Sequence, residues 1–391
     1  MENPEHSEQK EIEEESQVNI TNLSEINVSR DTWYARVSHT FLGWQRSLNR
    51  RSGRFAGAAS ILLLALIAVL IIFSSLHNAI THSPVKIVQY STPPIQYHFI
   101  YRDHPIAMYK GLDYVLNVAW SPDGARIASG GRDSTVQIWN TSTGKRLLTY
   151  RGHLHGVLAL AWSPDGTRIA SGSDDNTVQV WDAKTGKRLL TYRGHTNSVN
   201  SVAWSPDGTR IASASDDNTV QVWDVSTGKR LLTYLGNKTV VLAVAWSPDG
   251  TRIASGGIDW MVHVWDASNG KLLVLYREHN DLVSCLAWSP DGTRIASGSF
   301  DATVQVWNAS NGKHLLTYRG QPDSVYSLAW SPDGTRIVSG SYHDIVQIWN
   351  ASNGKSLYSF RSGGLFVAWS PHSPLIASGG EDGTVKIWSA T

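Results

Sequence analysis

The sequence is dominated by a repeat of 42 residues that occupies most of its length. The pentapeptide WSPDG begins at Trp120 and recurs at this interval five more times, and a degenerate copy starts at Trp369. A second tryptophan keeps the same period from Trp139 to Trp388, so the repeats hold 14 of the 17 tryptophans. A unit of this length cannot bury both of its faces alone, and the seven copies must therefore stack and share a core.

Each unit predicts four short antiparallel strands. In the second unit they are expected at residues 157–162, 168–171, 177–181 and 188–193. The Ser-Pro-Asp-Gly run at 163–166 fits a tight turn, with Pro at its second position and Gly where a positive φ is needed. The seventh unit ends three residues after Trp388, before a fourth strand. Residues 106–109 match that strand, and we expect them to supply the missing edge and close the ring.

Composition excludes several other classes of protein. The chain has 34 Lys and Arg against 33 Asp and Glu, a formal net charge of +1, so no nucleic-acid partner is expected. Its single cysteine, Cys285, excludes an intrachain disulfide framework and a zinc site built on cysteines.

The first 104 residues differ in character and predict a membrane anchor. Residues 1–31 carry nine acidic and two basic side chains, which is typical of a disordered acidic tail. Residues 32–54 hold five Arg, no acid and an apolar stripe at helical spacing, which favours a basic amphipathic juxtamembrane segment over an irregular linker. Residues 55–76 are 22 residues without a charge, and a helix of that length crosses a hydrocarbon core of about 30 Å. Residues 77–104, with three prolines, predict a stalk or linker.

The charges beside this predicted transmembrane helix indicate its orientation. Five arginines precede it, whereas Lys86 is the basic residue that closely follows it. Positive flanks remain in the cytoplasm, so we expect a single-pass membrane protein with a cytoplasmic N-terminus and an exported repeat domain. A cleaved signal peptide is the competing interpretation, but such peptides have a shorter apolar stretch at the very N-terminus.

The repeats resemble those of the WD40 family. Gly-His pairs stand at 152–153 and 194–195, and Trp-Asp pairs at 181–182, 223–224 and 265–266. The resemblance covers roughly residues 105–391 and implies an all-β fold, a seven-bladed β-propeller with one four-stranded sheet per blade. That domain is expected to be monomeric.

The resemblance also implies a buried network of His, Ser, Asp and Trp inside a blade, whose polar groups satisfy one another. Carried over by position, its members are His153, Ser171, Asp175 and Trp181 in unit two; His195, Ser213, Asp217 and Trp223 in unit three; and His279, Ser297, Asp301 and Trp307 in unit five. Units four and six have Asn237 and Gln321 at the His position, so we expect these blades to be locally weaker.

This repeated scaffold argues against an enzyme. Ser, His and Asp occur together as structural groups, and the strands expected to line the central channel contain no Asp, Glu, His, Lys or Arg. We therefore expect no catalytic residue, no metal site and no cofactor.

Two binding functions remain open. In the first, one propeller face recognises a protein or peptide, and the module acts as a scaffold. Ile258, Phe300 and Tyr342 occupy a turn position where the other four units have a charged residue, and Trp260 follows Ile258 by two residues, so these four are the expected contact patch. In the second, the domain adheres to an anionic lipid or polymer through basic hairpins. Their side chains are Lys145, Arg146, Lys187, Arg188, Lys229, Arg230, Lys271, Lys313 and Lys355.

Overall fold

The computed structural model describes residues 101–102, 104–342, 345–361 and 364–391. The acidic tail, the juxtamembrane segment and the span predicted at 55–76 lie outside these ranges, as does most of the predicted stalk. Within the ranges described, no helix has the length and apolar character needed to cross a bilayer.

The described residues form 29 strands. Blade one comprises β3 (Val115–Trp120), β4 (Arg126–Gly131), β5 (Val136–Asn140) and β6 (Arg146–Tyr150). Blade two comprises β7 (Val157–Trp162), β8 (Arg168–Ser173), β9 (Val178–Asp182) and β10 (Arg188–Tyr192). Blade three comprises β11 (Val199–Trp204), β12 (Arg210–Ser215), β13 (Val220–Asp224) and β14 (Arg230–Tyr234). Blade four comprises β15 (Val241–Trp246), β16 (Arg252–Gly257), β17 (Val262–Asp266) and β18 (Leu272–Tyr276).

The remaining blades follow the same order. Blade five comprises β19 (Val283–Trp288), β20 (Arg294–Ser299), β21 (Val304–Asn308) and β22 (His314–Tyr318). Blade six comprises β23 (Val325–Trp330), β24 (Arg336–Ser341), β25 (Ile345–Asn350) and β26 (Ser356–Arg361), with β1 (Tyr101–Arg102) added at its edge. Blade seven comprises β27 (Phe366–Trp369), β28 (Leu375–Gly379), β29 (Thr384–Ser389) and β2 (Ala107–Lys110).

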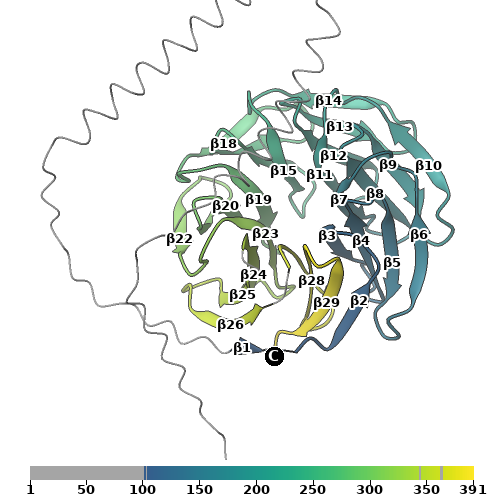
Figure 1. Cartoon of the computed structure of the whole chain (residues 1–391). Coiled ribbons are helices and arrows are strands. Elements are labelled where there is room, and N and C mark those ends of the chain that lie inside the picture. The colour runs from purple at the N-terminus through teal and green to yellow at the C-terminus, as the bar shows by residue number, and fades with distance from the viewer. Residues whose placement is uncertain (1–100, 103, 343–344, 362–363) are drawn as a thin grey trace, which may run out of the picture. The chain divides into compact units, whose positions relative to one another are not determined.

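The seven sheets are arranged around a common axis as a β-propeller (Figure 1). The first strand of each blade lies innermost and contacts the first strands of both neighbouring blades, from β3 through β27 and back to β3. Successive strands pair antiparallel within each blade. The predicted seven-bladed all-β architecture is confirmed.

The ring is closed by the strand that precedes blade one. β2 pairs antiparallel with β29, joining Ala107 to Ile387 and Lys110 to Thr384, so the predicted closure is also confirmed. Tyr109 is buried there, and its hydroxyl donates a hydrogen bond to the carbonyl of Thr141 at 3.0 Å. The N-terminal end of the domain thus supplies the outermost strand of its C-terminal blade and covers the outer edge of β29.

The turn sequence WSPDG also joins neighbouring blades. In blade two, Gly166 adopts φ 66°, as its turn requires, and its N–H donates to the carbonyl of Ser163 at 2.8 Å. The Arg168 guanidinium then lies 4.9 Å from the ring centre of Trp204 in the next blade. This stacking recurs across the next boundaries up to Arg336 and Trp369, and a cation–π pair of this kind contributes at least about 0.5–1 kcal/mol.

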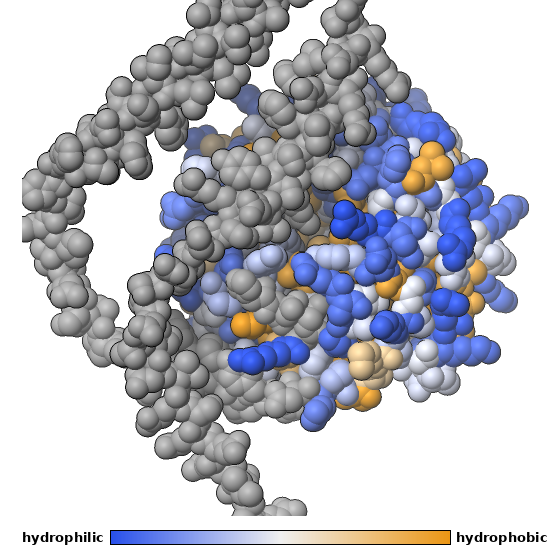
Figure 2. All heavy atoms as spheres, in the orientation of Figure 1, coloured by the Kyte–Doolittle hydropathy of each residue, from blue (hydrophilic) through white to orange (hydrophobic). Residues whose placement is uncertain are grey.

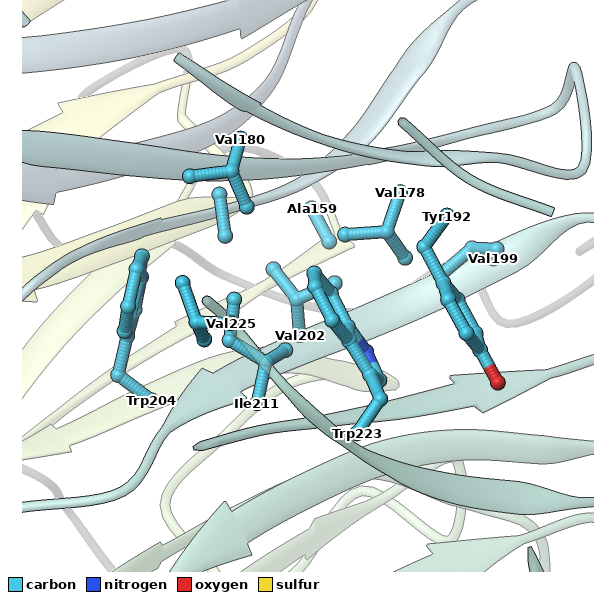
Figure 3. Close-up of a cluster of buried hydrophobic side chains, with 11 residues drawn as sticks. Ala159, Val178, Val180, Tyr192, Val199, Val202, Trp204, Ile211, Trp223 and Val225 are labelled. Carbon is cyan, nitrogen blue, oxygen red and sulfur yellow. The ribbon is translucent and has the colours of Figure 1, made fainter. Parts of the chain in front are cut away.

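The hydrophobic core lies between blades. Val178, Val180 and Tyr192 of blade two pack against Trp204 and Trp223 of blade three (Figure 3). Equivalent clusters fill the other boundaries, and Trp223 and its counterparts from Trp181 to Trp388 are almost fully buried. These interfaces explain the tryptophan content, because each sheet must bury a large apolar face against the next.

Candidate functional site

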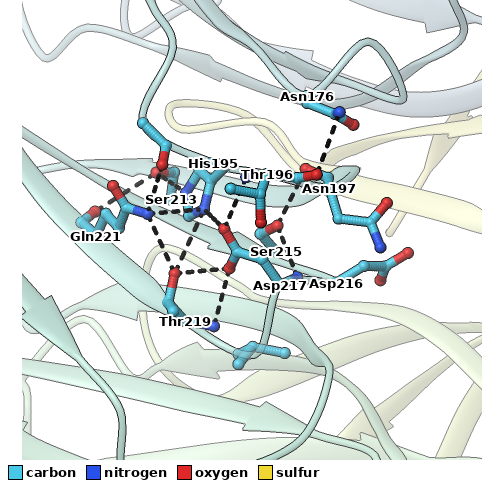
Figure 4. Close-up of polar contacts among 12 residues, drawn as sticks. Asn176, His195, Thr196, Asn197, Ser213, Ser215, Asp216, Asp217, Thr219 and Gln221 are labelled. Atoms are coloured by element: carbon cyan, nitrogen blue, oxygen red, sulfur yellow. Dashed lines mark hydrogen bonds and ion pairs between the residues drawn. The ribbon is translucent and has the colours of Figure 1, made fainter. Parts of the chain in front are cut away.

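The predicted polar network of blade three is assembled around His195 (Figure 4). Its Nδ1 lies 2.8 Å from Asp217 Oδ2, and its Nε2 lies 2.7 Å from Ser213 Oγ. Burial by itself would raise the pKa of Asp217, but hydrogen bonds from His195 and Thr219 outweigh it and hold that pKa at about 2. The carboxylate is therefore charged at neutral pH and fixes the imidazole in place.

Blades two and five contain the same arrangement. His153 contacts Asp175 at 2.9 Å and Ser171 at 2.7 Å, and His279 contacts Asp301 at 3.0 Å and Ser297 at 2.8 Å. The three imidazoles are shielded from solvent, and their serine hydroxyls face the core. Because no substrate can reach these hydroxyls, the geometry is that of a structural network rather than of a hydrolytic triad.

The tryptophans take part unequally. Trp181 Nε1 donates to Ser171 Oγ at 3.3 Å, whereas Trp223 and Trp307 keep a buried Nε1 with no hydrogen-bond partner in the described structure. All three indoles instead stack on a tyrosine of the preceding blade, as Trp223 does on Tyr192 with ring centres 4.8 Å apart. Stacking, more than the indole hydrogen bond, is the contact that the repeats share.

Blade four contains a different network, in which the imidazole comes from a residue that was not among the predicted ones. Asn237 occupies the His position, and its side-chain Oδ1 accepts a hydrogen bond from Ser255 Oγ at 2.9 Å, while its buried Nδ2 is unpartnered in the described residues. The imidazole is supplied by His263 of β17, whose Nε2 lies 3.1 Å from Asp259 Oδ2. The sequence does contain a sign of this replacement, because His263 stands at the repeat position that is Gln in other blades, as at Gln179, Gln221 and Gln305.

Blade seven contains a similar compensation. At the register of His263 it has Lys386, whose Nζ lies 2.7 Å from Asp382 Oδ2. A basic group on the third strand thus replaces the missing histidine in both blades. In blade six, Gln321 takes the histidine's place and donates through Nε2 to Ser339.

A ring of side chains surrounds the mouth of the central channel on the face that carries the network loops. In six blades, the first residue after the second strand donates its backbone N–H to the residue that precedes the innermost strand. These six residues are Arg132, Asp174, Asp216, Ile258, Phe300 and Tyr342. We call them, together with Glu381 of blade seven, the mouth ring.

The predicted contact patch lies on this ring. Phe300 and Tyr342 are both half-buried and are bridged by Tyr326 of β23, with ring centres 4.9 Å and 6.3 Å apart. In neighbouring blade four, Ile258 and Trp260 are 45% and 50% exposed, which is a large apolar area for a surface turn. Tyr326 was not among the predicted residues, because it lies in an innermost strand and the sequence does not show that its ring contacts Phe300 and Tyr342.

Trp260 adopts a backbone conformation that a bulky side chain disfavours. Its φ is 65°, in the left-handed region, where blades two and three have Asn176 and Asn218. A left-handed residue that is not Gly, Asn or Asp costs about 1–2 kcal/mol. The indole is half exposed, so its packing offsets little of this cost. Folding stability therefore does not explain why a tryptophan occupies this position.

We therefore expect Trp260→Asn to raise the free energy of unfolding by about 1 kcal/mol, because Asn tolerates the left-handed region. Urea unfolding of the variant and the wild type measures this difference. The matched control is Asn218→Trp at the same register in blade three, which should lower stability by a similar amount. An unchanged or lower stability of Trp260→Asn would contradict the assignment of strain.

The basic hairpins lie on the opposite face, with the WSPDG turns. All nine predicted basic side chains are exposed. Hydrophilic residues dominate the coloured part of the propeller surface that is visible in Figure 2. The same face carries acidic residues such as Asp165 and Asp207, which are about half exposed and lie within 4.0 Å of Arg168 and Arg210. The positive charges are thus interspersed with carboxylates and form no single-sign surface.

The described residues contain no cluster of three or more His, Cys, Asp or Glu side chains arranged to hold a metal ion. Cys285 lies on innermost strand β19, and burial raises the pKa of its thiol to about 12, which is unsuited to a nucleophile.

Comparison with known proteins identifies the repeat type. Seven stretches match the family described as "WD domain, G-beta repeat", and together they cover more than half of the chain: residues 104–140, 144–182, 186–224, 228–266, 270–308, 312–350 and 354–389. A periodic tryptophan protein 2 homologue of Dictyostelium discoideum is 49% identical over 45 residues, which are 11% of this chain and 5% of that protein. An uncharacterized WD repeat-containing protein of Nostoc sp. is 50% identical over 44 residues, which are 11% of this chain and 3% of that protein. The likeness to both relatives spans about one repeat.

Proposed function

We propose that this chain, which belongs to the family of WD40 repeat proteins, is a membrane-anchored binding module that recognises a protein or peptide through its mouth ring. WD40 propellers typically act as non-catalytic scaffolds for protein interactions.

The observation that carries the proposal is the break in ring polarity across three consecutive blades. Ile258 and Trp260 expose large apolar surfaces, and Phe300, Tyr326 and Tyr342 form a continuous aromatic row beside them. Aromatic side chains are the commonest energetic anchors of protein interfaces. The strain at Trp260 supports the same interpretation, because backbone strain clusters where a side chain serves binding.

The test is the triple variant Trp260→Ala, Phe300→Ala, Tyr342→Ala, compared with the wild type for affinity toward the partner that the wild type captures. We expect binding to weaken at least about tenfold, because two or three aromatic anchors are lost. A melting curve of the variant controls for folding. A second control, Leu147→Ala, removes a half-exposed leucine from the outer strand of blade one, away from the mouth, and should bind normally.

Unchanged affinity in the triple variant would contradict the proposed surface. The basic hairpin face would then be the next candidate, and a salt-sensitive affinity for anionic vesicles that falls on replacement of Lys187 and Lys229 would identify it.

The membrane part of the proposal is supported by the uncharged residues 55–76 and by the arginines that precede them. We expect protease added outside intact cells to digest the propeller or its stalk and to spare residues 1–54. Immunodetection with antibodies to each part measures the outcome, and a cytoplasmic marker protein controls for cell integrity. A protected propeller would reverse the orientation.

A further inference from the structure

The outer rim of the propeller carries strand edges of two kinds. In blade six, β1 pairs parallel with the outermost strand β26, joining Tyr101 to Ser359 and Arg102 to Phe360. In blade two, β10 is the outermost strand, and within the described residues no strand pairs with its outer edge. Such an edge presents backbone N–H and C=O groups with which another extended segment can pair.

A groove of about 440 Å³ lies along β10 at the register where β1 pairs in blade six. Thr191 and Tyr192 in this groove stand four repeats of 42 residues before Ser359 and Phe360. The lining comes from residues 190–194 and, in the next blade, from Thr227, Gly228 and Arg230. We call this groove, with the edge of β10 beside it, the rim site.

The rim site carries two guanidinium groups. Arg193 and Arg230 line the groove, and both side chains are exposed. Burial raises the pKa of Tyr192 to about 12, and the charge of Arg230 acts against this rise, which places that guanidinium near the buried phenol. Lys229, also exposed, adds a third basic side chain beside them.

Two carboxylates also bear on this region, and each is held by its own blade. Asp217, whose charge acts on Tyr192, contacts His195 Nδ1 at 2.8 Å. Asp224 Oδ1 accepts hydrogen bonds from the N–H and the hydroxyl of Thr227, both at 2.8 Å. A ligand carboxylate in the groove would therefore meet more basic than acidic groups, and two of the basic groups can bind it in a fork.

Neighbouring blades supply matched comparisons. The sequence of residues 188–194 is repeated without change at residues 146–152 of blade one, where Arg151 and Arg188 form the same pair across the next blade boundary. In blade three the two positions are Leu235 and Leu272, which are 66% and 43% exposed. The basic pair thus marks the outer edges of blades one and two and is replaced by an apolar pair in blade three.

The two faces of an added strand would meet different surroundings. Leu190 and Tyr192 of β10 pack into the core shared with blade three, whose hairpin carries Arg230. Leu189, beside them, is 49% exposed. Because side chains alternate along a strand, a segment added to β10 can direct acidic side chains to the arginines and apolar side chains to the other face.

We propose that the rim site binds an extended segment of a partner protein as a fifth strand, with acidic side chains at Arg193 and Arg230 and apolar side chains beside Leu189. The identical edge of blade one takes the same segment. This surface is separate from the mouth ring and does not depend on it. The pairing of β1 with β26 supplies the geometry, and the arginine pair supplies the charge complementarity.

The experiment uses the full chain in detergent at 0.15 M salt, roughly physiological ionic strength, and fluorescein-labelled peptides of alternating Val and Glu, read by fluorescence anisotropy. We expect a peptide with Lys in place of Glu to bind at least about tenfold more weakly. Equal binding of the Lys peptide would overturn the proposed charge selection.

Backbone methylation tests strand pairing at constant charge. In an added strand, alternate N–H groups point toward the partner strand, so N-methylation of one alternate set should weaken binding at least about tenfold, while methylation of the other set should have little effect. If both methylated peptides bind as tightly as the parent, charge attraction alone explains the binding and the strand-addition proposal is wrong.

Variants then locate the contact. Replacement of the four rim arginines by Leu, the residue found in blade three, should weaken the Val/Glu peptide at least about tenfold. The matched control removes the same number of charges from hairpins of other blades and should change affinity less than about twofold. Melting curves verify folding, and equal effects of the two variants would refute a local site. The rim variant is Arg151→Leu, Arg188→Leu, Arg193→Leu, Arg230→Leu, and the control is Lys145→Leu, Lys271→Leu, Lys313→Leu, Lys355→Leu.

A gain of binding provides the opposite test. Leu235→Arg with Leu272→Arg gives blade three the basic pair, and calorimetric titration should then count one more peptide site than in the wild type. An unchanged number of sites would show that the arginine pair does not select the ligand.

The mouth-ring variant separates the two proposals. The Trp260, Phe300 and Tyr342 triple variant should bind the Val/Glu peptide as tightly as the wild type. Loss of peptide binding in that variant would place the peptide at the mouth and overturn the rim site, whatever the variant does to the captured partner.

Discussion

A chain that begins at Asp113 should lose several kcal/mol of unfolding free energy and aggregate, because it lacks β2. Without β2, β29 becomes an open edge strand, and edges of this kind pair with other chains. The truncation also removes Tyr109, which is buried, stacks on Trp139 with ring centres 5.6 Å apart and donates to Thr141. Loss of a buried aromatic side chain alone costs about 3–5 kcal/mol.

Thermal melting and size-exclusion chromatography measure this effect on the propeller domain. The matched control begins at Pro105, and so keeps β2 while losing β1. In the full chain, Tyr109→Ala should destabilise strongly and Met108→Ala only slightly, because Met108 points to solvent and is 58% exposed. Equal stability of the chains that begin at Asp113 and Pro105 would show that closure does not depend on β2.

Much of this fold is predictable because the repeat presents the same physical signals seven times. The turns are marked by the Pro and Gly of WSPDG, and the strands by their alternation of side chains. Residues 106–109 are marked by their match to the fourth strand of the other units. Each of these signals lies within a short stretch of sequence, and the structure contains the turns and strands that they predict. The short strand β1 was not predictable. It pairs parallel with β26, joining Tyr101 to Ser359, in a segment that its prolines marked as a stalk.

The positions of the candidate contact patch were predictable, but the contacts among its side chains were not. The positions of Ile258, Phe300 and Tyr342 follow from the repeat register, whereas the bridging role of Tyr326 depends on the distance between two blades. The stacking of Arg168 on Trp204 also escaped, because it joins residues of different units. Contacts between units are set by the geometry of the ring, which no single repeat contains.

Blade four combines three departures from the other blades. It has Asn237 at the His position, the alternative imidazole of His263, and the strained, exposed Trp260. His263 also contacts the Tyr234 hydroxyl at 3.1 Å, so the buried groups of this blade are linked to blade three. The rebuilt network keeps Asp259 bonded near the turn that presents Trp260. The compensating polar contact and the proposed contact residue Trp260 therefore occur in the same turn.

We expect His195→Ala to lower the free energy of unfolding by about 3 kcal/mol. The substitution removes the imidazole that contacts both Ser213 and the buried carboxylate of Asp217, a cost of about 1–3 kcal/mol, and adds a cavity between the strands. Asn237→Ala at the same register of blade four should cost less than about 1 kcal/mol, because that amide makes one hydrogen bond and has a buried, unpartnered Nδ2.

His263→Ala separates this explanation from a general weakness of blade four. If His263 has taken over the structural role, its loss strips Asp259 and Tyr234 of a partner and should cost about as much as His195→Ala. Urea unfolding of the three variants ranks their losses of unfolding free energy. The comparison requires that all variants unfold with the same dependence of free energy on urea concentration. A cost for Asn237→Ala equal to that of His195→Ala would contradict the network assignment. A negligible cost for His263→Ala would show instead that blade four tolerates the loss of its histidine without compensation.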